Sequence, residues 1–367
     1  MNLSSKASID LSALLILILL SGYSYGNGWD YYNYYDFYEF IDSHYLDGVY
    51  LLLKAGIEPG YLGILFVINS FGLDYQFAVL SISVVSNLFL FFAVRKLGFD
   101  FLLFSLVFLS TYFLKFELST IRQGVAISIV LLSYCFILKG NKFKYFSFIL
   151  LASSFHYSAL VMLFFPVALS ASFFYSKRFS ILLILFAFPF FFLTIEMRDA
   201  FFSIVQQYFT GSSFIIGKLI TYFNRGSDNS LPLVQVYSCF IYFICLYYFA
   251  DFKDEKQRII ILLSNILLIV QFYLKFLPSI VTVRLEYYFI YSHLFCLMII
   301  IDSIRRQFNV AAFLFSTLIV CIVSLVITLR NPLDRKVYLP YYSIFHYIHD
   351  EESVRSREQV KYWSLQY

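Results

Sequence analysis

Apolar runs of about twenty residues, the length that a membrane-crossing helix needs, fill the chain from Leu11 to Leu329 between short charged breaks. Such a helix rises ~1.5 Å per residue and must cross ~30 Å of hydrocarbon. Hydrophobic residues make up 60% of the sequence and charged residues only 14%. A soluble domain has about a quarter of its residues charged. The sequence therefore predicts an all-α, polytopic membrane protein.

The charged breaks divide the chain into separate predicted spans. We expect the first run to be an uncleaved span, because the residues from Ser21 to Gly26 offer only a weak small-residue cleavage site. Residues 1–329 are assigned to one transmembrane domain and residues 330–367 to a C-terminal tail. About eleven spans of bilayer length are predicted, at residues 10–25, 76–94, 101–115, 121–138, 144–156, 158–175, 179–195, 232–249, 258–276, 285–301 and 310–329.

One apolar stretch, from Glu58 to Phe71, is too short for a regular span and is broken at Asn69. A full crossing there would move Arg95 and Lys96 to the outside of the membrane. We therefore expect a half-helix or re-entrant segment, which membrane proteins tolerate where it lines a cavity in the protein.

Residues 144–175 are too long for one span and barely enough for two. The polar turn from Phe155 to Ser158 divides them, and Ser158 is a plausible N-cap for the returning helix. Short helices that meet at a polar turn are common around sites within a membrane.

Lysine and arginine in short loops predict the orientation of the chain. With the N-terminus inside, the predicted spans place every basic short loop in the cytoplasm. Residues 26–59, 196–231 and the tail then lie outside, and the first of these loops holds six acids against the single Lys54. The basic positions on the inner side are Lys6, Arg95, Lys96, Lys139, Lys142, Lys144, Lys177, Arg178, Lys253, Lys256, Arg258, Arg305 and Arg306.

Several classes of site are missing from the sequence. The five cysteines all lie in apolar segments without metal-ligand spacing, so we interpret them as small buried hydrophobes. No P-loop, glycine-rich dinucleotide turn or HExxH motif is present, and no basic cluster with interleaved aromatic residues suggests nucleic acid. We therefore expect no metal, no cofactor and no nucleic-acid partner.

Ionisable groups at the edge of lipid are costly and indicate functional sites. Arg122 and Gln123 open a long apolar run on the predicted outer side. An arginine there presents a fixed fork of donors that suits a phosphate or pyrophosphate. The alternative is an interfacial arginine that reaches the lipid headgroups.

His156 lies in the turn between two predicted spans, also on the outer side. Histidine takes up a proton near neutral pH, which makes His156 a candidate general base. The alternative is a structural histidine that is hydrogen-bonded to a neighbouring helix.

Arg284 and Glu286 begin another span from the outer side. The two residues could pair with each other, or Arg284 could join Arg122 in binding one anionic group.

Two further pairs, Asp30 with Tyr34 and Glu58 with Tyr61, place acids and phenols on the same predicted face. Such groups suit sugar hydroxyls. Spacing alone favours the alternative, which is an aromatic belt with solvated acids.

These motifs, in this order, resemble the EpsG-like branch of the Wzy-type polymerases of bacterial O-antigen and exopolysaccharide. The resemblance covers nearly the whole chain, and its most specific parts are the IRQ and FHYSAL motifs. The residues that carry it are Asp30 and Tyr34, Glu58 to Tyr61, Ile121 to Gln123 with Ala126, Phe155 to Leu160, and Arg284 before Tyr288 and Phe289.

The resemblance implies a GT-C-like helical glycosyltransferase of the bacterial inner membrane. Such an enzyme joins oligosaccharide repeat units carried on undecaprenyl diphosphate at the periplasmic face, without a nucleotide sugar. A chain-length regulator and a flippase are possible partners. His156, Asp30 or Glu58 would act as the base, and Arg122, Gln123, Arg284, Glu286, Tyr34 and Tyr61 would bind the substrate.

Two other functions remain open. A flippase or transporter of lipid-linked oligosaccharide would also hold a diphosphate with cations, but the sequence lacks the internal repeat that transporters often show. A polytopic O-acyltransferase would need an acyl-donor site, and the sequence contains none that we can identify.

Overall fold

The computed structural model describes residues 3–208, 233–249, 254–307 and 310–345. Every regular element in these ranges is a helix, and the one β-bridge joins Ser24 to Ser343. The chain forms two compact units: Met1–Leu163 with Phe315–Tyr367, and Phe164–Leu314.

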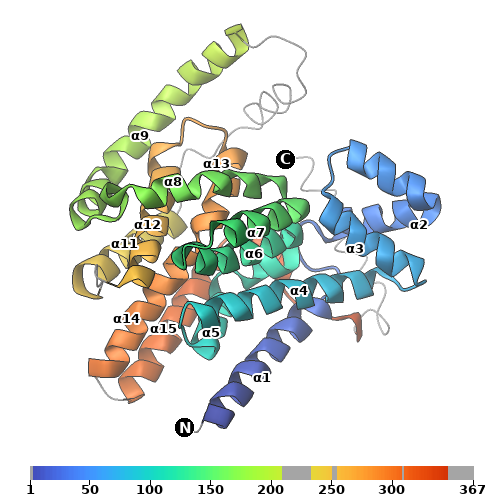
Figure 1. The fold of residues 1–367 in the computed structure, drawn as a ribbon, viewed down its shortest axis with the longest axis horizontal. Helices are drawn as coiled ribbons and strands as arrows, with labels where there is room; N and C mark the ends of the chain where they lie inside the picture. The colour runs from blue at the N-terminus through green and yellow to red at the C-terminus, as the bar shows by residue number, and fades with distance from the viewer. Residues whose placement is uncertain (1–2, 209–232, 250–253, 308–309, 346–367) are drawn as a thin grey trace. The chain divides into compact units, whose positions relative to one another are not determined.

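The first unit is built around α6, which is almost wholly buried. Helices α4 and α7 pack against it, and α1 packs against α4 (Figure 1). The elements that lie mostly in this unit are α1 (Leu3–Gly22), α2 (Tyr31–Lys54), α3 (Pro59–Ser70), α4 (Tyr75–Lys96), α5 (Phe101–Thr111), η1 (Leu114–Ser119), α6 (Ile121–Leu138), α7 (Lys142–Phe155), η2 (Tyr157–Phe164), α15 (Val310–Thr328) and α16 (Pro332–Tyr338).

Local sequence signals set the ends of these helices. Asp74 starts α4 by accepting a hydrogen bond from the Gln76 backbone N–H at 3.0 Å. After the helix ends, Gly98 adopts a φ of 83°, a conformation that glycine allows at little steric cost.

The second unit is tied together by polar groups inside an apolar bundle. Asn265 donates to Phe174 O at 2.7 Å and to Ser180 Oγ at 2.9 Å, and its Oδ1 accepts from Tyr242 OH at 2.8 Å. Its elements are α8 (Phe165–Ser170), η3 (Ser172–Tyr175), α9 (Lys177–Tyr208), α11 (Leu233–Ile244), η4 (Cys245–Phe249), α12 (Glu255–Leu268), η5 (Ile269–Tyr273), α13 (Ser279–Phe289) and α14 (Tyr291–Gln307).

Within the described ranges, six helices are long and apolar enough to cross a membrane. They overlap the predicted spans at 76–94, 121–138, 179–195, 258–276, 285–301 and 310–329. Their bounds are Tyr75–Lys96, Ile121–Leu138, Lys177–Ile204, Lys256–Tyr273, Val281–Arg306 and Ala311–Thr328. The all-α membrane class is confirmed, whereas the count of about eleven full spans and the GT-C-like arrangement stay predictions.

The predicted span at 158–175 is not one continuous helix. It consists of the 3-10 helix η2, the short α8 and a further 3-10 turn, η3. Pro166 lies in the first turn of α8, where it lacks the N–H that would continue the preceding helix. Ser158 lies inside η2 and contacts His156 instead of capping an α-helix, although residues Tyr157–Ser170 are helical as expected.

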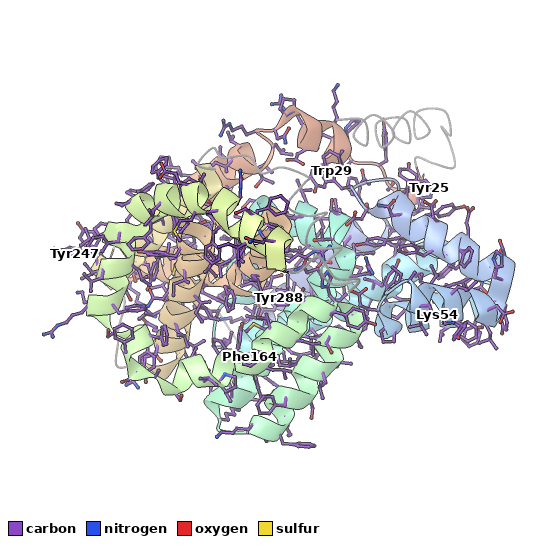
Figure 2. All side chains as sticks on the ribbon, turned by 90° about the horizontal axis from the view of Figure 1, so that it is seen from above. Tyr25, Trp29, Lys54, Phe164, Tyr247 and Tyr288 are labelled. Carbon is purple, nitrogen blue, oxygen red and sulfur yellow. The ribbon has the colours of Figure 1, made fainter. Side chains whose placement is uncertain are left out.

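The segment 26–59, expected as a loop, is mostly helix α2, which is broken at Tyr45 with a φ of 51°. Its tyrosines recur at helical spacing. Tyr31, Tyr35 and Tyr38 all place their rings 5.5 to 5.9 Å from the ring of Tyr75 in α4. Tyr25 and Trp29 precede this helix and Lys54 ends it (Figure 2).

The other predicted outer segments lie mostly beyond the described ranges. Helix α9 continues to Tyr208, so residues 196–208 are helical, while 209–231 and 346–367 lie outside the description. The segment 58–71 contains α3, whose 12 residues span about 18 Å, less than the ~30 Å of a bilayer core. Its re-entrant character stays a prediction.

Candidate functional site

Arg122 and Glu58 form an ion pair in the first unit, although they lie 64 residues apart in the sequence. Arg122 lies in the first turn of α6, and Glu58 immediately precedes α3. The exposed fractions of the two side chains are only 19% and 7%. Burial strengthens the attraction between the two charges but also removes their hydration. Each buried charge therefore needs the other to offset its lost hydration.

Aromatic rings surround the guanidinium group of Arg122. Its Cζ lies 5.2 Å from the ring centre of Tyr34, 5.6 Å from that of Tyr61 and 6.0 Å from that of Phe37. Such cation–π contacts hold the guanidinium plane in place. Arg122 Nε is buried without a hydrogen-bond partner in the described part of the chain, so one donor of the fork is unused.

Glu58 also reaches the turn that contains His156. Its Oε1 accepts a hydrogen bond from the Tyr157 backbone N–H at 3.4 Å. Helices α3 and α7 approach closely here, because a β-carbon on Gly60 would lie 2.5 Å from Ser154 Oγ and 2.8 Å from Ser154 O. A glycine is therefore needed at position 60 for Glu58 to meet this turn.

His156 ends α7 in an extended conformation, with a φ of −156°. Its Nδ1 accepts a hydrogen bond from the Ser158 backbone N–H at 3.3 Å and lies 2.7 Å from Ser158 Oγ. A neutral imidazole whose Nδ1 accepts carries its proton on Nε2. In this arrangement, the basic nitrogen of His156 is engaged by Ser158, and Nε2 is a donor.

Asp30 and Tyr34 complete the cluster from the start of α2. Tyr34 donates from its hydroxyl to Asp30 Oδ2 at 3.2 Å. Burial, with a smaller contribution from the charge of Asp30, raises the pKa of the Tyr34 phenol well above its ordinary value. Tyr34 therefore stays protonated and acts as a donor.

Two predicted site residues, Arg284 and Glu286, belong to the second unit. Glu286 Oε1 accepts from Lys275 Nζ at 3.3 Å and from Gln235 Nε2 at 3.4 Å. The pairing of Arg122 with Arg284 stays a prediction. Gln123 is buried in α6 of the first unit.

Sequence reasoning missed three residues that the structure places in polar or aromatic contacts. Phe37 completes the rings around Arg122, and Lys275 pairs with Glu286. Glu117, a buried acid in η1, bonds to α4. The signal for Glu117 was a lone acid in an apolar run five positions before Arg122, and it could have been recognised by the cost of burying a charge.

No group of three or more His, Cys, Asp or Glu residues in the described ranges could hold a metal ion. All five cysteines are described, and none of them forms a disulfide. In the cluster of the first unit, Arg122 can donate hydrogen bonds to an anion. The carboxylates of Glu58 and Asp30 can accept hydrogen bonds from hydroxyl groups.

Comparison with known families gives one match. The family model described as the EpsG family matches residues 9–348. Searches of curated proteins and of solved structures gave no match. The matched range includes every residue of the cluster around Arg122.

Proposed function

Because the chain belongs to the EpsG family, we propose that it is a membrane glycosyltransferase that polymerises oligosaccharide repeat units carried on undecaprenyl diphosphate. The product is O-antigen or a related surface polysaccharide, and the reaction takes place at the periplasmic face of the bacterial inner membrane. The family supports the broader role in making a polysaccharide in a membrane, and the lipid carrier and the face come from the resemblance described above.

The proposed reaction is a substitution at an anomeric carbon. A hydroxyl group of the incoming lipid-linked repeat attacks the first sugar of the growing chain. The new C–O glycosidic bond forms as the bond to diphosphate breaks, and undecaprenyl diphosphate leaves with the electron pair. The hydroxyl proton passes to a base, so no nucleotide or redox partner is needed.

The observation that carries this proposal is the ion pair of Arg122 with Glu58. A departing diphosphate needs a cation placed in advance, and preorganised donors are often the largest contribution to such catalysis. Arg122 is held by three rings and retains a buried, unused Nε donor. The guanidinium geometry suits two phosphate oxygens.

Glu58 is the base that this geometry favours among the three candidates. When the diphosphate binds Arg122, it repels the carboxylate of Glu58, and Glu58 loses its cationic partner. A carboxylate without its cation binds a proton more readily. The substrate would therefore activate the base by its own binding, and Glu58 would accept the proton of the attacking hydroxyl.

His156 suits a different task, because Ser158 engages its Nδ1. Its Nε2–H can donate to a sugar hydroxyl or to an oxygen of the leaving group. Asp30, which accepts from Tyr34, can accept from a sugar hydroxyl. These two residues would orient the sugars rather than take the reacting proton.

The surface glycan of a deletion strain tests the function. A missing polymerase leaves glycan one repeat long on a gel, and the wild-type gene restores the ladder of longer chains. A missing flippase, the second candidate, leaves no surface glycan at all. Loss of all surface repeats, with the carrier-linked repeat accumulating inside, would contradict the proposal and favour the flippase.

A further inference from the structure

A buried acid joins three elements of the first unit near the candidate site. Glu117 lies in the π-helical turn η1 and is only 5% exposed. Its Oε1 accepts from Ser86 Oγ at 2.7 Å, and its Oε2 accepts from Asn87 Nδ2 at 2.8 Å. Both partners lie in α4 and both are neutral, so hydrogen bonds, and no ion pair within the described ranges, hold this carboxyl group.

The network continues from α4 into α1. Asn87 Nδ2 lies 3.4 Å from Ser21 Oγ, and Ser21 Oγ lies 2.5 Å from Ser83 Oγ. Placing a carboxylate in an apolar helical bundle is unfavourable, and such residues default to functional roles. Here the result is a turn that is fixed to two helices at once.

Other residues of η1 contact the segments that carry Arg122 and Asp30. A β-carbon on Gly124 would lie 2.3 Å from Phe116 O, so α6 packs directly on the backbone of η1. A β-carbon on Gly28, whose φ is +95°, would lie 2.1 Å from Leu118 O. Gly124 follows Arg122 by two positions and Gly28 precedes Asp30 by two.

Ser119, the last residue of η1, strengthens the second of these contacts. Its Oγ accepts from the Trp29 backbone N–H at 2.9 Å and lies 2.7 Å from Tyr338 OH. Trp29 also donates from its indole Nε1 to Asp334 Oδ1 at 2.8 Å. Trp29 therefore reports on the position of η1.

We infer that Glu117 is a positioning residue, which fixes η1 and through it sets the places of Arg122 and Asp30 in the candidate site. The claim that this placement serves polymerisation rests on the proposed function. The claim that Glu117 fixes η1 does not, and it can be measured without any activity.

The test uses the full-length protein in lipid nanodiscs with Trp363→Phe, which leaves Trp29 as the remaining tryptophan. Glu117→Ala removes both hydrogen bonds. Glu117→Gln can keep both, because its amide oxygen can still accept from Asn87 Nδ2 and its amide nitrogen can donate to the Ser86 hydroxyl, which can either donate or accept. Asp10→Asn is the matched control: Asp10 is a buried acid in α1 that pairs with Arg95, away from η1.

The inference predicts that Glu117→Ala shifts Trp29 emission to longer wavelength, raises its quenching by acrylamide at least twofold, and shortens the glycan of the complemented deletion strain. Glu117→Gln and Asp10→Asn should retain wild-type emission and long chains. If Glu117→Ala inserts poorly, Glu117→Gln alone distinguishes a positioning role of Glu117 from a chemical one.

Two results would overturn the whole inference, and a third would overturn its functional half. Unchanged Trp29 emission in a well-inserted Glu117→Ala variant would mean that Glu117 does not fix η1. Lost polymer in Glu117→Gln with unchanged Trp29 emission would mean that the carboxylate acts chemically. A shifted emission in Glu117→Ala with unchanged glycan would leave η1 fixed by Glu117 but remove its link to polymerisation, and so would count against the functional half of the inference.

Discussion

Glu58 Oε2 accepts a hydrogen bond from Arg122 Nη1, and this contact joins the segment that starts α3 to the first turn of α6. The pair brings two of the sequence motifs together within the first unit. Because both side chains are mostly buried, the geometry of the pair is fixed by its surroundings rather than by solvent.

Arg122→Lys should reduce polymer formation by about tenfold or more, since a lost hydrogen bond to a charged group is worth about 1.5–3 kcal/mol. An ammonium group keeps the charge, but it cannot stack on the rings of Tyr34 and Tyr61 or bind two phosphate oxygens with a planar fork of donors. The measurement is glycan chain length at matched expression. Arg95→Lys is the control, because Arg95 pairs with Asp10 elsewhere in the same unit.

An exchange of the two charges, Glu58→Arg with Arg122→Glu, separates structure from chemistry. We expect the double variant to recover normal insertion and thermal stability but to make no long chains. Long chains from the double variant, or from Arg122→Lys, would show that the pair has only a structural role.

Glu58→Gln should lower the polymerisation rate by about 10²–10⁴-fold, which is the usual contribution of a general base. His156→Gln should retain part of the activity, because its amide oxygen can accept from the Ser158 N–H and its amide nitrogen can donate in place of Nε2. Single-turnover rates of the purified variants measure both effects. The opposite ranking, with His156→Gln inactive and Glu58→Gln active, would make His156 the base.

Gly60→Ala should destabilise the protein by about 1–3 kcal/mol, the usual range for overpacking, because its methyl group would meet Ser154 Oγ at 2.5 Å. Gly63→Ala on the same helix is the control, since nothing lies within 4 Å of a β-carbon there. Thermal unfolding in detergent compares the two. Equal melting temperatures would mean that α3 and α7 are not in close contact.

The turn at Tyr157 should face the periplasm, and the loop at Asn141 the cytoplasm, as the lysine and arginine distribution predicts. Both positions are exposed and lie beyond opposite ends of α7. A thiol reagent that cannot cross the membrane should label Tyr157→Cys in intact cells and spare Asn141→Cys. Labelling of Asn141→Cys alone would show that the topology is the reverse of the predicted one and that the site does not face the periplasm.

The length of the apolar runs predicted the helices that are apolar from end to end. The predicted span at 121–138 coincides with α6, and that at 76–94 lies within α4, because a charged break or a capping acid ends each of them. The same reasoning missed α2, since its acids suggested a solvated loop. The tyrosine spacing that packs α2 on Tyr75 was present in the sequence, but it could not reveal its partner.

The sequence allowed us to predict which residues belong to the candidate site, but not which of them contact one another. Arg122, Glu58 and the turn at His156 were each singled out, yet nothing in their spacing indicates that Glu58 contacts both of the others. The position of η1 could not be predicted either, because it depends on a hydrogen bond between Glu117 and Asn87, which lie 30 positions apart in the sequence. Such contacts depend on how helices pack, and the apolar pattern leaves that packing open.

The most direct test of the account uses the purified protein in nanodiscs with a lipid-linked repeat unit and no nucleotide. We expect a ladder of longer lipid-linked chains, with one undecaprenyl diphosphate released for each bond formed, and a much slower appearance of the ladder with Glu58→Gln or Arg122→Lys. If the wild-type protein leaves every repeat unjoined and moves it across a sealed bilayer instead, the protein is a transporter and the account is contradicted.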